Sequence, residues 1–449
     1  MAFTPHTDND IVQMLKVIGA NSIDDLFKEI PAEVRNKKDL KLEAPLSESE
    51  VLRELQRLAN RNATPETHRS FLGGGTYNHF IPAVVDFLTS RSEFATAYTP
   101  YQSEISQGTL QAIFEFQTLI CQITGMEAAN ASMYDGASAC AEAALMAARL
   151  TRRKKILTSR ALHPEYRETL ATYCRFLEME LIDLSFNKNG ETSLEDLQAH
   201  LDDQTAGVIL GYPNFFGVIE NIAPLAPLVH DQGAKLVVAV QEAASLGLIK
   251  APGALGADIV IGEGQSFGIP PAFGGPHAGF FAVRQKDVRS IPGRLVGETV
   301  DQEGKRGYVL TLSTREQHIR REKATSNICS NHGLCALRAT VYLSLLGKDG
   351  LRTVAVQNHS KAEYAKQQIS AVDGFTLPFS APTFNEFVIE AKEPVEQVMA
   401  RLESNGILGG IPLQTFYPEM ENHFLVCVTE QNSREDIDIL VQTLGTSRT

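Results

Sequence analysis

The sequence predicts an α/β protein with a mainly parallel sheet, an N-terminal helical arm and a small C-terminal α+β domain. Between residues 71 and 330, short apolar segments alternate with helical stretches, as in a parallel sheet with crossover helices. Before this region apolar residues recur at helical spacing, and after it a long helix leads into strands and helices. We therefore predict three domains over residues 1–70, 71–330 and 331–449, within the range expected for 449 residues.

The arm is predicted from helical spacing and a capping signal. Ser47 and Glu50 form a capping box, and Pro31 and Pro45 divide the arm into short helices. The apolar positions are Ile11, Met14, Leu15 and Ile18, then Leu52, Leu55 and Leu58. Small amphipathic helices have little core of their own, so we expect the arm to pack on another domain or subunit.

Apolar segments bounded by Gly, Pro, Asp or Asn give the strands of the large domain. They are Lys155 to Thr158, Met179 to Asp183, Val208 to Leu210, Lys235 to Val240, Asp258 to Ile261 and Gly279 to Val283. A helix is expected to begin at Thr192 or Ser193.

The C-terminal region is predicted to alternate helices and strands. The elements are a helix at His332 to Leu346, a strand at Phe387 to Ile389, a helix at Pro394 to Glu403, a strand at Phe424 to Val428 and a helix at Ser433 to Leu444. Gly406 suits a helix C-terminus, and Ser433 with Asp436 suits a helix N-terminus.

Composition narrows the function classes. A formal net charge of −13 argues against nucleic acid as a partner, because phosphate binding needs an excess of clustered Lys and Arg. We find no apolar segment of membrane-spanning length and no leader pattern, so we expect a cytoplasmic protein. The six cysteines lack metal-ligand spacing, so we expect reduced thiols and no metal.

Residues 257–279 form a strand followed by a glycine-rich turn, where one large enzyme class keeps the lysine that binds pyridoxal phosphate. No lysine occurs between Lys250 and Lys286. A Schiff base needs an amine on a rigid element, so this chain has no amine for it here.

Gln241 follows the predicted strand at Lys235 to Val240, at the usual ligand edge of a parallel sheet. In pyridoxal enzymes of the aspartate aminotransferase fold, an aspartate at this edge pairs with the pyridinium nitrogen. Gln241 cannot supply that charge, and we expect its neighbour Glu242 to face the other side of the strand.

Residues 134–139 precede an alanine-rich helix and could form an anion-binding turn. Asp135, Gly136, Ala137 and Ser138 would let backbone N–H groups approach a phosphate. The alternative is a small-residue turn that only lets the helix pack closely.

Two further segments, 71–79 and 98–108, are dense in glycine, aromatic and hydrogen-bonding residues, which suits a ligand surface. A packing role for each residue stays open, and His79 alone is typical of a structural histidine.

The sequence also contains two basic clusters, which are either solvated faces or docking sites for an acidic partner. The first cluster is residues 152–155, and the second consists of Arg315, Arg320, Arg321 and Lys323.

Together these segments resemble the alpha subunits of glycine dehydrogenase (decarboxylating), the P-protein of the glycine cleavage system. The resemblance covers about residues 8 to 445. Its matching segments are residues 71–80, 97–117, 134–139, 256–281 and 314–329.

The resemblance implies an aminotransferase-like fold (fold type I of the pyridoxal phosphate enzymes) and an alpha2beta2 assembly. In that assembly the beta subunit carries pyridoxal phosphate on its own lysine. Gln265 then stands at the lysine place and Gln241 at the aspartate place. The implied reaction, aminomethyl-transferring glycine dehydrogenase, releases the glycine carboxylate as CO2 and passes the aminomethyl group to the lipoyl arm of the H-protein.

Within this family, the alpha chain is expected to complete the partner's active site and to shape the channel for the lipoyl arm. Tyr98, Tyr101 and Glu104 are the first candidates for the active-site role. Thr76, Tyr77, Asn78 and His79 are expected to lie behind them. We assign these residues positioning and desolvation rather than proton transfer.

Two alternatives stay open from the sequence. One is a free-standing pyridoxal phosphate decarboxylase or desulfurase with a lysine elsewhere. The other is a structural or regulatory subunit of the same complex that touches no substrate.

Overall fold

The structure is a computed structural model that describes residues 5–36 and 41–446. The chain divides into two compact units, one ending at Ala63 and one beginning at Thr64, and each is described by itself.

The first unit is helical, as predicted. It contains α1 (Asp8–Ile18), the 3₁₀ helix η1 (Ile23–Phe27) and α2 (Glu48–Ala59). Ser47 and Glu50 form the predicted capping box, and no residue of the three helices is buried. Packing of this arm on another domain or subunit stays a prediction.

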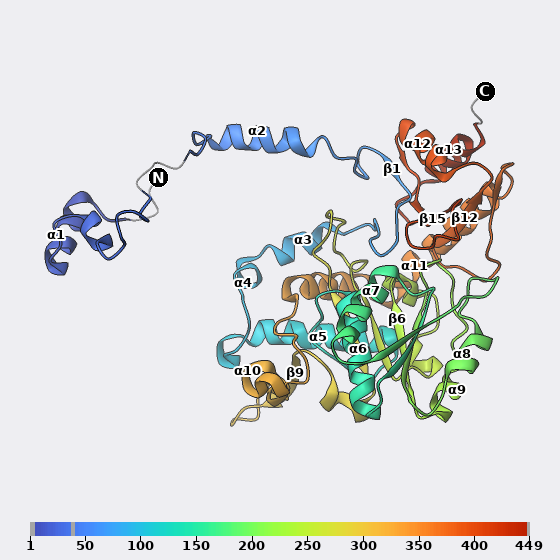
Figure 1. The fold of residues 1–449 in the computed structure, drawn as a ribbon, viewed down its shortest axis with the longest axis horizontal. Helices are drawn as coiled ribbons and strands as arrows, with labels where there is room; N and C mark the ends of the chain where they lie inside the picture. The colour runs from blue at the N-terminus through green and yellow to red at the C-terminus, as the bar shows by residue number, and fades with distance from the viewer. Residues whose placement is uncertain (1–4, 37–40, 447–449) are drawn as a thin grey trace. The chain divides into compact units, whose positions relative to one another are not determined.

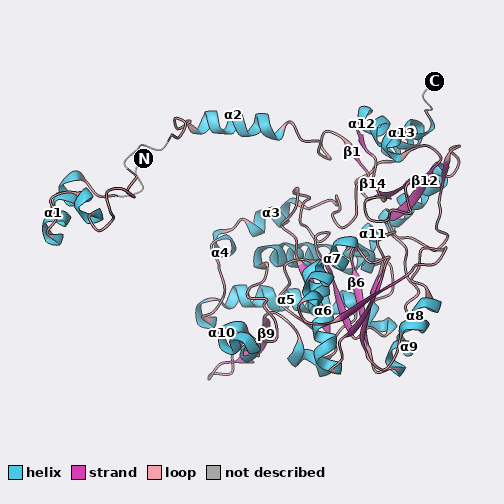
Figure 2. Cartoon of the chain, in the orientation of Figure 1, coloured by secondary structure: helices cyan, strands magenta, loops and turns pink. Residues whose placement is uncertain are grey.

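A seven-stranded sheet forms the centre of the second unit (Figures 1 and 2). Neighbouring strands from β4 through β3, β5 and β6 to β7 are parallel, whereas β8 and β2 pair antiparallel. In sheet order the strands are β2 (Ala128–Ala129), β8 (Gly279–Val283), β7 (Ile259–Glu263), β6 (Lys235–Val240), β5 (Thr205–Gly211), β3 (Lys155–Ser159) and β4 (Glu180–Leu184). The mainly parallel sheet is confirmed.

Both faces of this sheet are buried. Along β5, Val208 and Leu210 belong to one core cluster and Ile209 to another, because successive side chains point to opposite faces. The helices of this region are α3 (Ala83–Thr89), α4 (Ser92–Ala95), η2 (Ser103–Ile105), α5 (Gln107–Thr124), α6 (Gly136–Thr151), α7 (Pro164–Arg175), α8 (Leu194–His200), α9 (Leu225–Asp231), η3 (Ala243–Gly247), η4 (Pro252–Leu255) and η5 (Gln285–Ser290).

After η5 the chain forms a hairpin that the sequence analysis did not identify. Strands β9 (Leu295–Val300) and β10 (Arg306–Thr311) pair antiparallel. Three short helices follow: η6 (Ser313–Arg315), α10 (Gln317–Arg320) and η7 (Arg321–Lys323).

The long helix α11 (Gly333–Ile369) links two cores, with a break at Gly347, where φ is 58° and ψ is −170°. The predicted helix ends at this break. Ala336 and Tyr342 pack in the core of the large sheet, whereas Ala362 packs in the C-terminal core. The change of core therefore falls inside α11, and the domain boundaries at residues 70 and 330 stay predictions.

The C-terminal region is a four-stranded sheet with two helices, which confirms the α+β prediction. In sheet order the strands are β11 (Phe375–Thr376), β12 (Glu386–Ala391), β15 (His423–Cys427) and β14 (Ile411–Pro412), and the helices are α12 (Val395–Ser404) and α13 (Arg434–Gly445). Strand β13 (Ile407–Leu408) pairs with β1 (Arg69–Ser70). This pairing brings the segment after β1 to the C-terminal region.

Over residues 5–36 and 41–446, no helix has the length and apolar character that crossing a membrane requires.

Candidate functional site

A buried polar cluster lies at the carboxyl ends of β6 and β7, the edge where open parallel sheets bind ligands. Gln241 follows β6, Gln265 follows β7, Tyr77 comes from the segment after β1, and Glu386 begins β12. The exposed fractions of these four residues are 4% or less. Residues from both ends of the second unit therefore share one solvent-excluded site.

The side-chain amide of Gln265 is fully engaged with backbone groups. Its Oε1 accepts a hydrogen bond from Tyr77 N at 2.8 Å. Its Nε2 donates to Tyr77 O at 3.0 Å and to Ile269 O at 2.6 Å. Gln265 thus binds the Tyr77 backbone in the way a neighbouring strand would, and this holds the segment around Tyr77 against the sheet.

Gln241 and Glu386 hold the side chain of Tyr77. Gln241 Nε2 donates to Tyr77 Oη at 2.9 Å, and Tyr77 Oη donates to Glu386 Oε2 at 2.9 Å. The second oxygen of Glu386 accepts from Gly74 N at 2.6 Å. Burial raises the pKa of Glu386 to about 8, against the lowering effect of these hydrogen bonds.

The predicted anion-binding turn is occupied by carboxylates of the chain itself. Glu263 accepts from Gly136 N at 3.0 Å and from Ala278 N at 3.0 Å, and Asp135 accepts from Ser138 N at 2.7 Å. These carboxylates face the N-terminus of α6, where the helix dipole favours negative charge. A hydrogen bond from His277 to Glu263 raises the pKa of His277.

Pyridoxal phosphate does not fit this arrangement. The group needs an amine for its Schiff base, a carboxylate for its ring nitrogen and an open site for its phosphate. Gln265 and Gln241 present neutral amides, and Glu263 places a negative charge against the helix N-terminus that a phosphate would need. We therefore derive no reaction step through pyridoxal phosphate at this cluster.

His79 bridges two carboxylates beside this cluster. Its Nε2 lies 3.2 Å from Glu242 Oε2, and its Nδ1 lies 2.8 Å from Glu430 Oε2. Burial alone would lower the pKa of His79, but the hydrogen bonds and charges of the two glutamates outweigh it and raise the pKa to about 10. The imidazolium therefore ties the segment around residue 79 to the end of β6 in the large sheet and to the C-terminal region.

The prediction for Glu242 was wrong. We expected it to face away from the Gln241 side of the strand, but β6 ends at Val240. Alternation holds only within a strand, and Glu242 instead caps η3 and contacts His79. Both side chains therefore contact the segment of residues 77–79.

The structure divides the predicted site residues into a buried group and an exposed group. Tyr77 and His79 are buried, and their neighbours Thr76 and Asn78 are partly buried. Thr76 Oγ1 lies 3.5 Å from His277 Nε2, and Asn78 O accepts from Thr429 Oγ1 at 2.8 Å.

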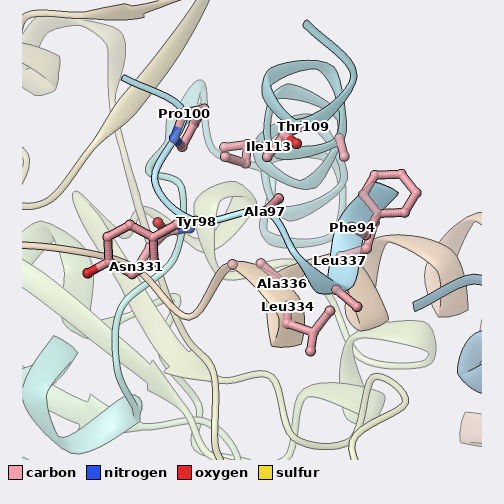
Figure 3. A pocket seen from close by; sticks show the side chains of 13 residues that line it. Phe94, Ala97, Tyr98, Pro100, Thr109, Ile113, Asn331, Leu334, Ala336 and Leu337 are labelled. Carbon is pink, nitrogen blue, oxygen red and sulfur yellow. The ribbon is translucent and has the colours of Figure 1, made fainter. Parts of the chain in front are cut away.

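The exposed group comes from the segment between α4 and α5. Tyr98 is 88% exposed, Tyr101 is 61% exposed, and Glu104 is exposed. Tyr98 lines an apolar cavity of about 270 Å³. Thr109 and Ile113 of α5 and Leu334 of α11 also line it (Figure 3). These three site residues therefore remain available to a partner surface.

Arg294 lies against the exposed group and was not identified by the sequence analysis. It is 4% exposed, and its guanidinium donates to Thr99 Oγ1 at 3.3 Å and to Tyr101 Oη at 3.1 Å. The same group lies 5.3 Å from the Tyr101 ring centroid, in cation–π contact, and 3.8 Å from Glu316. Only the fold brings Arg294 to residues 99–101, so no local pattern could have identified it.

Solved structures of low sequence identity share this fold. The chain matches a Lactobacillus brevis glutamate decarboxylase with a TM-score of 0.70 and 14% identity, over 93% of this chain and 98% of that one. It matches a NifS-like protein from Rickettsia africae with a TM-score of 0.61 and 14% identity, over 83% and 97% of the two chains. These likenesses confirm the aminotransferase-like fold and carry no further argument.

More similar proteins show the family. The chain is 54% identical over 443 residues to "Probable glycine dehydrogenase (decarboxylating) subunit 1" from Bacillus cereus and from Bacillus mycoides, covering 99% of this chain and 98% of each relative. It matches a solved glycine decarboxylase (P-protein) of the glycine cleavage system, in inhibitor-bound form, with a TM-score of 0.92 and 44% identity over 99% of both chains. The family model for the glycine cleavage system P-protein matches residues 1–444. The chain therefore belongs to the glycine cleavage system P-protein family.

Proposed function

We propose that this chain is the cofactor-free half of a glycine decarboxylase and acts only with a second subunit, as an alpha2beta2 assembly. The buried amides of Gln265 and Gln241 support this proposal, because they follow β7 and β6, where the family resemblance puts the lysine and the aspartate of the pyridoxal phosphate enzymes. The name "subunit 1" of the relatives supports a second subunit. That subunit would hold pyridoxal phosphate on its own lysine, and the group would supply the electron sink for decarboxylation.

In this assembly the exposed group would complete the partner's active site. Tyr98, Tyr101 and Glu104 would border the space for glycine, orient the substrate and exclude water. Arg294 would hold Tyr101 in place, because its guanidinium contacts both the hydroxyl and the ring. The buried group around Tyr77 and His79 would support this surface from behind. The aminomethyl group would then pass to the lipoyl arm of an H-protein.

The test is co-expression with the second subunit, followed by glycine–bicarbonate exchange measured for each chain alone and for the pair with lipoylated H-protein. We expect exchange in the pair and none in this chain alone. Exchange by this chain alone, or an absorbance band of bound pyridoxal phosphate that borohydride fixes to one of its lysines, would contradict the proposal.

Variants of the exposed group test its role. In the assembled pair we expect Tyr101→Phe and Glu104→Ala each to lower exchange by roughly tenfold or more, because misplaced substrate loses rate steeply. Glu195→Ala, which removes another exposed glutamate, serves as the matched control and should have no effect. If both site variants exchange at the wild-type rate and bind glycine normally, the chain is a structural subunit.

A further inference from the structure

The short helices α10 and η7 form an exposed basic surface, which we call the docking loop and define as residues 317–323. All seven residues are exposed. The loop holds three permanent cations, Arg320, Arg321 and Lys323, against one carboxylate, Glu322. The chain as a whole has a formal net charge of −13, so this local excess of positive charge is opposite in sign to the rest of the molecule.

The cations of the docking loop are not used inside the chain. Arg320 donates from Nε to Thr314 O at 3.3 Å, and it forms no ion pair with a described residue. Among residues 5–36 and 41–446, neither Arg321 nor Lys323 has a side-chain hydrogen-bond or ion-pair partner. Their charge is therefore free to attract a partner.

The other basic cluster, at residues 152–155, differs in this respect. Arg153 donates to Thr205 O at 2.9 Å, and the Nζ of Lys155 lies 2.8 Å from Asp202. Lys154 pairs with Glu178 at 3.4 Å. Three of the four cations in this cluster thus serve internal contacts. In the second predicted cluster Arg315 also serves one, because it donates to Gly293 O at 3.0 Å, whereas Arg321 and Lys323 do not.

The docking loop also adjoins the exposed group of the candidate site. Glu316 directly precedes the loop and lies 3.8 Å from Arg294, which in turn contacts Thr99 and Tyr101. Arg315, one residue before Glu316, also donates to Gly293 O at 3.0 Å, beside the start of β9. A protein bound at the loop would therefore lie near Arg294 and Tyr101.

We propose that the docking loop binds an acidic face of the carrier protein that receives the aminomethyl group, an inference that rests on the proposed function. An acidic carrier would be repelled by most of this negatively charged chain and attracted by the loop. Opposite charges mainly raise the rate of encounter and fix the orientation of the partner. The loop would thus deliver the lipoyl arm next to the exposed group.

The test uses the assembled pair with lipoylated carrier protein and the variant Arg320→Ala/Arg321→Ala/Lys323→Ala. At low ionic strength we expect the KM for the carrier to rise about tenfold, while the KM for glycine and kcat stay unchanged. The difference between variant and wild type should shrink as salt is added. The matched control, Lys188→Ala/Lys250→Ala/Lys286→Ala, removes three exposed lysines elsewhere and should behave as wild type.

An unchanged KM in the docking-loop variant, or an equal rise in the control, would overturn the inference. Direct titration of the carrier into the pair, followed by calorimetry, separates this inference from the proposed function. If the wild-type pair is inactive, the proposed function fails, and a salt-dependent loss of carrier affinity confined to the docking-loop variant would still support the loop as a docking surface. Equal carrier affinity in all three proteins would overturn it.

Discussion

The carboxylate of Glu263 occupies the backbone N–H groups of the turn before α6 that an anion would otherwise bind. Its Oε1 accepts from Gln265 N at 3.1 Å and from Ala278 N at 3.0 Å, while its Oε2 accepts from Gly136 N. A bound anion at this place would satisfy some of the same N–H groups. The chain supplies that negative charge itself, so the polar backbone groups of the turn stay paired without a ligand.

His79 allows a test of stability at the residue scale. Replacing it by Gln leaves Glu242 and Glu430 buried without their cation, so we expect His79→Gln to lower the free energy of unfolding by about 3–5 kcal/mol at neutral pH. Urea unfolding of the chain measures this change. The control is His200→Gln, because His200 pairs with Asp196 near the surface, and a loss of equal size there would contradict the assignment.

The pH dependence of stability should follow from the same histidine. The folded-state pKa of about 10 lies above the ordinary value of 6.5, so the folded state binds the proton more tightly than the unfolded state. The stabilisation is complete below pH 6.5 and is lost as the pH rises towards 10. Glu386 acts in the same direction. Its folded-state pKa of about 8 lies above the ordinary value of 4.5, so its contribution to stability is lost as the pH rises from 4.5 to about 8. We therefore expect the urea midpoint of wild type to fall from pH 6.5 upwards, with a shallower fall in His79→Gln.

At the scale of elements, the start of α6 depends on the absence of a side chain at residue 136. A Cβ added to Gly136 would overlap Tyr166 Oη. We expect Gly136→Ala to destabilise the chain by about 1–3 kcal/mol, because the tyrosine or the helix must shift. Gly108→Ala, in the first turn of α5, meets no atom within 4 Å and should be neutral or stabilising by up to about 1 kcal/mol. Urea unfolding of both variants decides, and equal effects would show that the contact with Tyr166 is unimportant.

Elements with a strong local pattern were predicted closely, and weakly patterned ones were missed. Strands β6 and β8 match their predicted ranges because both are apolar over most of their length and buried on both faces. Strands β9 and β10 were missed because half-exposed residues dilute the apolar pattern along both strands. Their pairing supplies the stability that the local sequence does not indicate.

At the scale of the whole molecule, we expect the second unit to fold without the arm and the arm to strengthen association with the second subunit. The second unit has its own cores, whereas no residue of α1, η1 or α2 is buried. We expect a chain lacking residues 1–63 to lose only the helical circular dichroism of the arm and to keep its thermal midpoint, but to bind the second subunit more weakly. Analytical ultracentrifugation of the mixed subunits measures the association. A truncated chain that unfolds, or that assembles as tightly as the full chain, would contradict this expectation.

The sequence by itself determined the fold class, most strands and helices, and the lack of a lysine in the segment after the strand at residues 258–261. Apolar periodicity and caps act over a few residues, so they can be identified in the sequence without tertiary information. The absence of lysine between Lys250 and Lys286 needs no structure at all. Gln241 and Gln265 were likewise identified before their contacts were known.

Only the tertiary structure decided what surrounds those two amides. The partner of the Tyr77 hydroxyl, Glu386, is 309 residues away, and Glu430 is 351 residues from His79. Arg294 reaches Tyr101 across 193 residues. Such contacts form where separate elements meet in space. A buried charge or hydroxyl is costly to leave unpaired, so it pairs with a group that the fold brings within hydrogen-bond distance, whatever the separation along the chain.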